Sequence, residues 1–482
     1  MSTLSPKDKK FYLIAIVTVI IMLGFGYLPT FGQVTPDGMK ILGLFLGCIF
    51  AWLFSELVWS SILGMVLLTM FGYGTMTENY ASAFANGTVQ IMVTSIVFCY
   101  TIEKSGLLAE VSRWIVGQKW AQKSPWFIIF VFFLASAIAA MMTGNMIPVM
   151  VILWALFYEL AHEIGVKAHD PFALIVLCGI GVAACMGTST MPYTGMPTLV
   201  RGMAEASTPG FMYNTAEYIL MNLLLNLIYL ILIVLVLRVF FGSAIKYVEI
   251  PKKDSYKMNL NAQSKIALVF LILLILSLII PNFLPADNAL RIMVNNQLTV
   301  PGIFMLFSAI LMIIRVKEKP VLDIPTALAN VPWPLFLLVS TALCISDYLT
   351  ADGMGVVPTI VSFLSPLVAG KSAFVVTLMF VAFGLILTNF INDMVTIMVL
   401  FPIAAQFILD AGGSIMLLAI LFGQACVQGC FMPSGSIIGA MLHGNTEWMS
   451  SKEVFKYVGI MELVVLVSLI ILTLIGGVIG IK

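Results

Sequence analysis

The chain has 482 residues, of which 61% are apolar and only 10% are charged, and its formal net charge is +1. Soluble domains carry roughly 45–50% apolar and about 25% charged residues, so this composition excludes a water-soluble globular protein. The balanced charge gives no reason to expect a nucleic-acid partner. The sequence therefore predicts an all-α polytopic membrane protein surrounded by membrane lipids.

Apolar runs long enough to span a bilayer recur along the whole chain. The first, Phe11 to Leu28, has no small-residue cleavage site after it and is predicted to be an N-terminal transmembrane helix within 1–30, not a signal peptide. Further spans are predicted at 35–54, 60–75, 88–104, 171–200, 216–240, 264–284, 299–314, 333–348, 414–442 and 455–480.

Two longer apolar stretches, 125–160 and 373–409, are each interrupted by a polar tip. The tips are Thr143-Gly144-Asn145 and the segment from Thr388 to Asp393, which includes Asn392. Non-helical backbone at membrane depth persists only where protein or a water-filled cavity satisfies it. Arms of about fifteen residues are roughly 22 Å long, short of a ~30 Å hydrocarbon core. Both stretches are therefore predicted to be re-entrant helical hairpins.

Lysine and arginine residues gather in four clusters between the apolar runs. They are Lys7, Lys9 and Lys10; Arg113, Lys119 and Lys123; Arg238, Lys246, Lys252, Lys253 and Lys257; and Arg315, Lys317 and Lys319. With a cytoplasmic N-terminus and two hairpins that return to their own side, all four clusters fall on one face, as the positive-inside rule requires. We expect a location in the inner (plasma) membrane, with 246–262 as a cytoplasmic linker.

The two hairpins belong to an internal repeat. Residues 144–154 align without gaps on 392–402, an offset of 248 (392 − 144), and Met191-Pro192 aligns on Met432-Pro433, an offset of 241 (432 − 191). An odd number of spans separates the halves in this topology, so the repeats, 31–245 and 263–482, are predicted to be inverted. Substrate binds near the midplane of such carriers, where discontinuous helices meet.

Each repeat also contains a span interrupted by glycine and proline, at 171–202 and 414–444. Pro192 and Pro433 fall at matching positions in these two segments. A proline costs a helix about 3 kcal/mol unless the freed carbonyl is satisfied. A bound ion or a polar group of the substrate can satisfy it, so both segments are predicted to be broken helices at the binding site.

The hairpins, broken helices and inverted repetition resemble the divalent anion/sodium symporter (DASS) family of the ion-transporter superfamily. The likeness covers nearly the whole chain and includes Thr35-Pro36-Asp37-Gly38-Met39-Lys40 at the start of the second span. It implies a homodimeric elevator, with a fixed scaffold and a mobile transport domain, that carries di- or tricarboxylates with Na+. Family members have Ser-Asn-Thr at each tip, whereas this chain has Gly144-Asn145-Met146 and Asn392-Asp393-Met394.

Residues at the two tips and two breaks are the candidate site. The predicted substrate-binding residues are Thr143, Gly144, Asn145, Pro192, Thr194, Asn392, Asp393, Pro433 and Ser434. The predicted ion-binding residues are Gly144, Asn145, Gly187, Thr188, Thr388, Asn392, Asp393 and Gly429. No cofactor is expected beyond Na+ as the coupling ion.

Asp393 stands out because a carboxylate at membrane depth costs about 2.5–3.5 kcal/mol on insertion scales. It could ligate sodium, carry a proton or pair with a cationic substrate group. Glu103 and Asp347 are interpreted as helix-end residues, and Arg201 as a snorkelling side chain. The expected function is cation-coupled transport or exchange of succinate-, malate- or citrate-type anions. The alternative is a proton-coupled antiporter of the same superfamily with an inorganic anion or cation as its substrate.

An enzyme is not predicted. The three histidines lie outside any motif for nucleophilic catalysis, and no paired acidic motif falls within the spans. Cys426 and Cys430 have helical spacing but no further ligands nearby, so they are interpreted as small apolar packing residues and not as a metal site.

Overall fold

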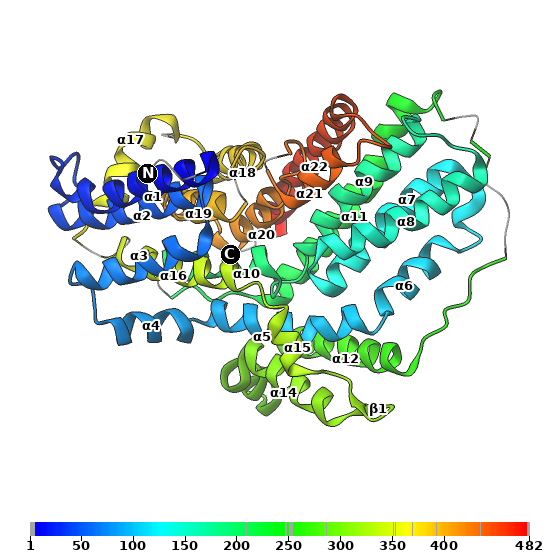
Figure 1. Cartoon of the computed structure of the whole chain (residues 1–482), viewed down its shortest axis with the longest axis horizontal. Coiled ribbons are helices and arrows are strands. Elements are labelled where there is room, and N and C mark those ends of the chain that lie inside the picture. The colour runs from blue at the N-terminus through cyan, green and yellow to red at the C-terminus, as the bar shows by residue number, and fades with distance from the viewer. Residues whose placement is uncertain are drawn as a thin grey trace.

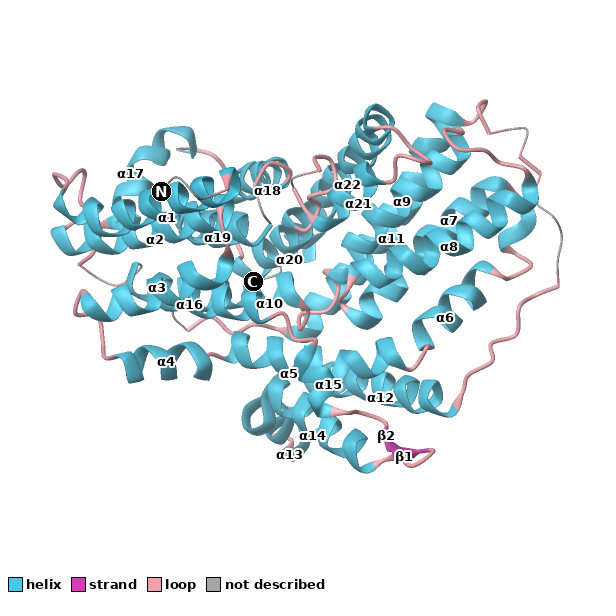
Figure 2. Cartoon of the chain, in the orientation of Figure 1, coloured by secondary structure: helices cyan, strands magenta, loops and turns pink. Residues whose placement is uncertain are grey.

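The computed structural model describes residues 5–208, 210–245, 248–249, 254–285, 287–349, 351, 353–368, 370–391, 393–433 and 435–479. Within them the regular secondary structure is helical except for one two-stranded hairpin, and loops connect the elements (Figures 1 and 2). Ten helices in this part of the chain are long and apolar enough to cross a membrane. The prediction of an all-helical polytopic membrane protein is confirmed.

The first half of the chain forms eleven helices in the described residues. They are α1 (Pro6–Gly24), α2 (Pro36–Phe54), α3 (Leu57–Met70), α4 (Met76–Ala85), α5 (Gly87–Lys104), α6 (Leu107–Val116), α7 (Pro125–Thr143), α8 (Met146–Ile164), α9 (Pro171–Thr188), α10 (Gly195–Ser207) and α11 (Thr215–Phe241).

The described part of the second half contains eleven further helices and the two strands. They are α12 (Ala262–Ile279), α13 (Ala289–Ile292), α14 (Thr299–Ile313), β1 (Arg315–Val316), β2 (Lys319–Pro320), α15 (Ile324–Ala329), α16 (Trp333–Leu349), α17 (Val356–Val368), α18 (Ala373–Thr388), α19 (Asp393–Asp410), α20 (Ile415–Cys426), α21 (Ile437–Gly444) and α22 (Ser451–Ile479). A π-helix, Met293–Leu298, joins α13 to α14.

The helices coincide with the predicted spans to within a few residues, and each of the two long apolar stretches forms two successive helices that contact each other, α7 with α8 and α18 with α19. The expected arm length is wrong for the first pair, in which each arm has 19 residues. The residues of the polar tip end one helix and begin the next, and they do not form a separate loop. Thr143 ends α7, Gly144 is its C-cap with a φ of 67°, and Asn145 is the N-cap of α8.

Both interrupted spans are broken at the positions that Pro192 and Pro433 predict. The chain leaves helical geometry after Thr188 and resumes α10 at Gly195; in the second half it leaves α20 after Cys426 and resumes α21 at Ile437. Helix α9 is buried along almost its whole length and packs closely on α7, while α10 packs on α19 and α20. The two halves therefore share one core around their breaks.

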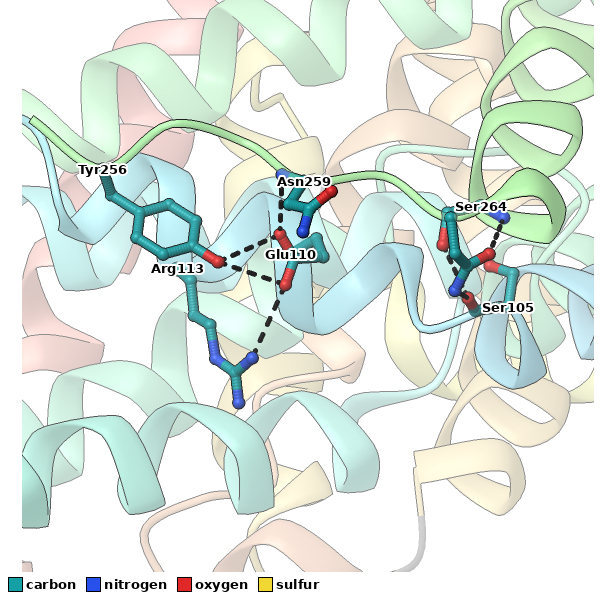
Figure 3. A network of polar contacts seen from close by, with 7 residues as sticks. Ser105, Glu110, Arg113, Tyr256, Asn259 and Ser264 are labelled. Atoms are coloured by element: carbon teal, nitrogen blue, oxygen red, sulfur yellow. Dashed lines mark hydrogen bonds and ion pairs between the residues drawn. The ribbon is translucent and has the colours of Figure 1, made fainter.

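Residues 254–261, here called the linker strap, run without helix or strand along α6 (Figure 3). The Glu110 carboxylate accepts hydrogen bonds from the Tyr256 hydroxyl, at 3.1 and 3.2 Å, and from the backbone N–H of Asn259 at 3.1 Å. The hydroxyl of Ser264, in the first turn of α12, donates to the Ser105 carbonyl at 2.6 Å. The linker thus lies on the same face as the segment between α5 and α7, in agreement with the pattern of basic residues.

Candidate functional site

The first tip is held between its own capping bonds and helix α5. Asn145 caps α8 by accepting from the backbone N–H of Ile147 at 3.2 Å, and its amide donates to the Glu103 carboxylate at 3.1 Å. The Thr143 hydroxyl donates to the Ala139 carbonyl at 3.3 Å. The interpretation of Glu103 as an ordinary helix-end residue misses this contact, which brings a half-buried carboxylate to the tip.

The first break lies directly against this tip. A Cβ added to Gly144 would overlap the Thr194 side chain, so the tip approaches the break closely because residue 144 is glycine. The Thr194 hydroxyl donates to the carbonyl of Thr188 at 2.8 Å, which closes the turn of the break. A Cβ on Gly187 would overlap the backbone of Ala137, so that glycine is needed for the contact between α7 and α9.

Both prolines lie in the breaks and not within a helix. Pro192 is buried and its carbonyl accepts from the Thr198 hydroxyl at 3.4 Å, whereas Pro433 is exposed. Because each proline precedes the next half-helix, neither removes a hydrogen bond from a helix interior. The predicted site residues Asn392 and Ser434 lie outside the described residues.

Oxygen atoms converge at the second tip. The Thr388 hydroxyl lies 3.0 Å from Asp393 Oδ1 and also within hydrogen-bonding distance of the Cys426 carbonyl, at the end of α20. Asp393 is only 4% exposed. A Cβ on Gly429 would lie 2.7 Å from Asp393 Oδ1, so a glycine in the break leaves room for this carboxylate.

A second carboxylate reaches this tip from the last helix. The amide of Asn389 donates to Glu462 Oε2 at 2.9 Å, and its Oδ1 accepts from the backbone N–H of Phe431 in the second break at 2.8 Å. The other carboxylate oxygen, Glu462 Oε1, is buried without a hydrogen-bond partner in the described part of the chain. Sequence reasoning missed this residue because nothing along the chain connects α22 with the tip.

The two breaks also contact each other. The sulfur atoms of Cys185 in α9 and Cys430 in the second break lie 3.3 Å apart. The Ser189 hydroxyl, in the first break, donates to the Gly423 carbonyl in α20 at 3.1 Å. Each tip therefore lies against its own break, and the breaks are joined in the centre of the molecule.

A group of buried amides surrounds the first break and was not predicted. Gln424 donates to the side-chain oxygen of Asn222 at 2.7 Å, and Asn226 donates to the Thr190 hydroxyl at 2.9 Å. Several oxygen atoms here are buried without a hydrogen-bond partner among the described residues, including Asn226 Oδ1, Gln424 Oε1 and Thr188 Oγ1. Buried polar groups normally find a partner, so these oxygens are available to a bound ion or water.

Three acidic side chains lie at the tips. Glu103, Asp393 and Glu462 have no ion pair among the described residues. The described residues also contain no group of three or more histidine, cysteine or acidic side chains arranged to hold a metal ion. The site is instead built from hydroxyl, amide and carbonyl oxygens around single carboxylates, a donor set suited to a hard monovalent cation.

A membrane-spanning helical fold with two hairpins packed against two broken helices defines a membrane transporter. Residues 45–423 match the family described as "CitMHS: Citrate transporter", and the chain belongs to this citrate transporter family. The resemblance to the ion-transporter superfamily is thereby confirmed, and the chain is a carrier and not an enzyme.

Among solved structures, the chain is similar to the YdaH transporter of Alcanivorax borkumensis, whose crystal structure is described as having an unusual topology. The two share 14% sequence identity with a TM-score of 0.62, over 98% of each chain. This likeness shows a common fold. No curated protein matches the sequence.

Proposed function

We propose that this chain is a cation-coupled secondary transporter for citrate and related di- or tricarboxylates. Membership of the citrate transporter family supports the substrate class. Three carboxyl groups lie at the tips without an ion pair among the described residues, and in their ionised form they would repel an anionic substrate. A cation bound between carboxylate and substrate removes that repulsion, which favours coupling.

The observation that carries the proposal is the environment of Thr388. Its hydroxyl has one hydrogen but two oxygen neighbours, the Asp393 carboxylate and the Cys426 carbonyl. The single hydrogen can lie in only one of the two oxygen–oxygen contacts. The other contact needs a cation or a second proton to offset the repulsion between the two oxygens. Sodium among these oxygens supplies that charge, and a proton on Asp393 is the alternative, which corresponds to the proton-coupled antiporter considered from the sequence.

We infer an elevator built from two inverted repeats. Each half has a hairpin followed by a broken helix, α7–α8 with α9–α10 and α18–α19 with α20–α21. Helix α5 of the first half packs on α14 of the second, and α16 of the second half packs on α3 of the first. Each half therefore contributes a helix that packs on a helix of the other half. This symmetry supports a common ancestry of the halves and a scaffold that contains α2, α3, α12 and α14.

A homodimer in the inner membrane is part of the proposal. Helices α12 and α14 expose large apolar side chains, among them Ile272, Leu276 and Met305, which suit either lipid or a second scaffold. The oligomeric state can be measured by crosslinking in membranes, together with light scattering in mild detergent over a range of protein concentrations. A monomer in both measurements contradicts the dimer.

Uptake into proteoliposomes tests the function. We expect saturable uptake of labelled citrate that depends on an imposed Na+ or H+ gradient and shows counterflow from the inside. Succinate, malate and sulfate complete the substrate panel, and imposed gradients of either cation distinguish the two coupling ions. Uptake without saturation or counterflow would indicate a channel, and uptake of sulfate alone would contradict the carboxylate assignment.

A further inference from the structure

A polar cavity of about 510 Å³ lies between the loop that joins α10 to α11 and the helices α12, α13 and α14, and it lies away from the tips. None of the tip or break residues lines it. Its charged residues are Arg201, Glu205 and Arg291, which leave a net charge of +1 (2 − 1). The cavity is therefore positive, whereas the described carboxylates at the tips have no cationic partner.

The two arginines come from different parts of the fold. Arg201, on α10, donates through Nε to Glu205 at 2.8 Å, and its guanidinium lies 5.0 Å from the centre of the Tyr213 ring. Arg291, on α13, donates to the backbone carbonyl of Leu284 at 2.7 Å. A guanidinium offers five N–H donors in a planar fork, so these bonds hold both side chains in place and leave donors for a carboxylate.

The backbone of the cavity wall is unusual at the same place. The wall includes Asn296, within the π-helix Met293–Leu298, and Thr299, which has a φ of 57°. Single turns of π-helix occur frequently at functional sites, and a β-branched residue with positive φ is a strained outlier. Such strain persists where the surrounding structure holds a binding geometry.

The cavity includes a residue of α10, the half-helix that begins at the first break. Arg201 is seven residues beyond Thr194 of the first break, which is about 10 Å along the helix axis. The cavity also includes Thr215, at the start of α11, and Ser277, near the end of α12. Helix α12 begins directly after the linker strap and Ser277 lies near its other end, so the cavity lies at the end of α12 opposite the strap, on the outer face in the expected orientation.

We propose that this cavity is an entry site, where Arg201 and Arg291 bind a carboxylate of the transported anion before it reaches the tips. The proposal rests on the proposed function for the identity of the anion. Arg291 lies on α13, between the scaffold helices α12 and α14 in the chain, and Arg201 lies on α10, which moves with the transport domain in the proposed elevator. The entry site therefore joins the moving half-helix α10 to the scaffold.

Labelling of an introduced cysteine tests anion binding directly, without relying on transport. All seven native cysteines are buried, and Asn296 is exposed on the cavity wall. Citrate should slow the reaction of Asn296→Cys with a negatively charged thiol reagent, and Arg291→Gln should raise the citrate concentration needed roughly tenfold. Arg315→Gln is the matched control, since Arg315 also donates to a backbone carbonyl, that of Glu318, but lies outside the cavity.

Two comparisons separate the possible results. Ser372→Cys, an exposed helix cap outside the cavity, should react at the same rate with and without citrate. Lack of protection of Asn296→Cys by citrate, or equal protection in the Arg291→Gln and Arg315→Gln backgrounds, overturns the entry site. Slowing by phosphatidylglycerol nanodiscs, compared with phosphatidylcholine nanodiscs, with no further effect of citrate, would assign the cavity to a lipid headgroup and overturn the proposal as well.

Transport by the same variants distinguishes the entry site from the proposed function. Arg291→Gln should raise the KM for citrate at low ionic strength with little change in kcat, and added salt should reduce the difference because exposed charges are screened. Protection by citrate without any citrate uptake by the parent would contradict the proposed function and retain the anion site. Uptake by the parent with an unchanged KM in Arg291→Gln would overturn the entry role.

Discussion

The side chain of Asn389 joins the second hairpin to the last helix, because its amide donates to the Glu462 carboxylate at 2.9 Å. The same amide also donates to the Leu385 carbonyl at 2.9 Å, so Glu462→Ala would leave one of its two buried N–H groups without a partner, at a cost of about 1–3 kcal/mol. We expect a lower thermal midpoint for Glu462→Ala in detergent, with Glu462→Gln close to the parent because it retains an acceptor. Equal midpoints for the alanine variant and the parent would show that the contact does not stabilise the hairpin.

Asp393 is the residue expected to couple transport to the cation. Asp393→Asn keeps the shape of the side chain but removes the charge beside Thr388, so the dependence of citrate uptake on Na+ or H+ should become flat while the protein remains folded. Asp410→Asn, at the exposed end of the same helix, is the control and should behave as the parent. Coupling is assigned elsewhere if Asp393→Asn retains the cation dependence of the parent.

Two glycines test the packing of the first tip on its break. Gly144 and Gly165 both cap helices with positive φ, 67° and 72°, but only at Gly144 would a Cβ meet a neighbour, the side chain of Thr194. Both alanine variants carry the strain of a left-handed residue, about 1–2 kcal/mol. We expect Gly144→Ala to lose citrate transport as well, and Gly165→Ala to retain it. Equal uptake by the two variants would argue against tight contact at the tip.

The linker strap is expected to depend on Glu110. Glu110→Ala removes the acceptor for Tyr256 and Asn259, and hydrogen bonds to charged groups contribute about 1.5–3 kcal/mol. Hydrogen exchange over residues 254–261 should accelerate about tenfold or more. Asp254→Asn breaks only the exposed ion pair with Lys119 and should have little effect. Similar exchange in both variants would mean that the strap is held by other contacts.

The positions of spans, hairpins and breaks could be predicted because their signals are local. Apolar runs set the helices, and Pro192 and Pro433 mark the breaks. The length of the first hairpin's arms could not be read in this way, since Gly144 and Asn145 serve as helix caps and not as a loop.

The partners of the tips depend on contacts between distant parts of the chain. Asn389 and Glu462 are 73 residues apart, and Asn145 and Glu103 are 42 apart. A carboxylate in an apolar helix indicates a functional or interfacial residue, but the sequence alone does not say which tip it faces. The sequence does identify Asp393, because this residue lies within the tip itself.

If the proposed elevator operates, the three carboxylates at the tips also make transport sensitive to voltage. In the proposed elevator cycle, the charge that an empty transport domain carries through the membrane field depends on how many of Glu103, Asp393 and Glu462 are ionised. Each elementary charge that crosses the field is worth about 2.3 kcal/mol per 100 mV, so an inside-negative potential favours outward movement of net negative charge and opposes its inward movement. Currents recorded from planar bilayers should therefore depend on the number of cations bound on the return step, and exchange without net charge movement should persist at potentials that suppress net uptake.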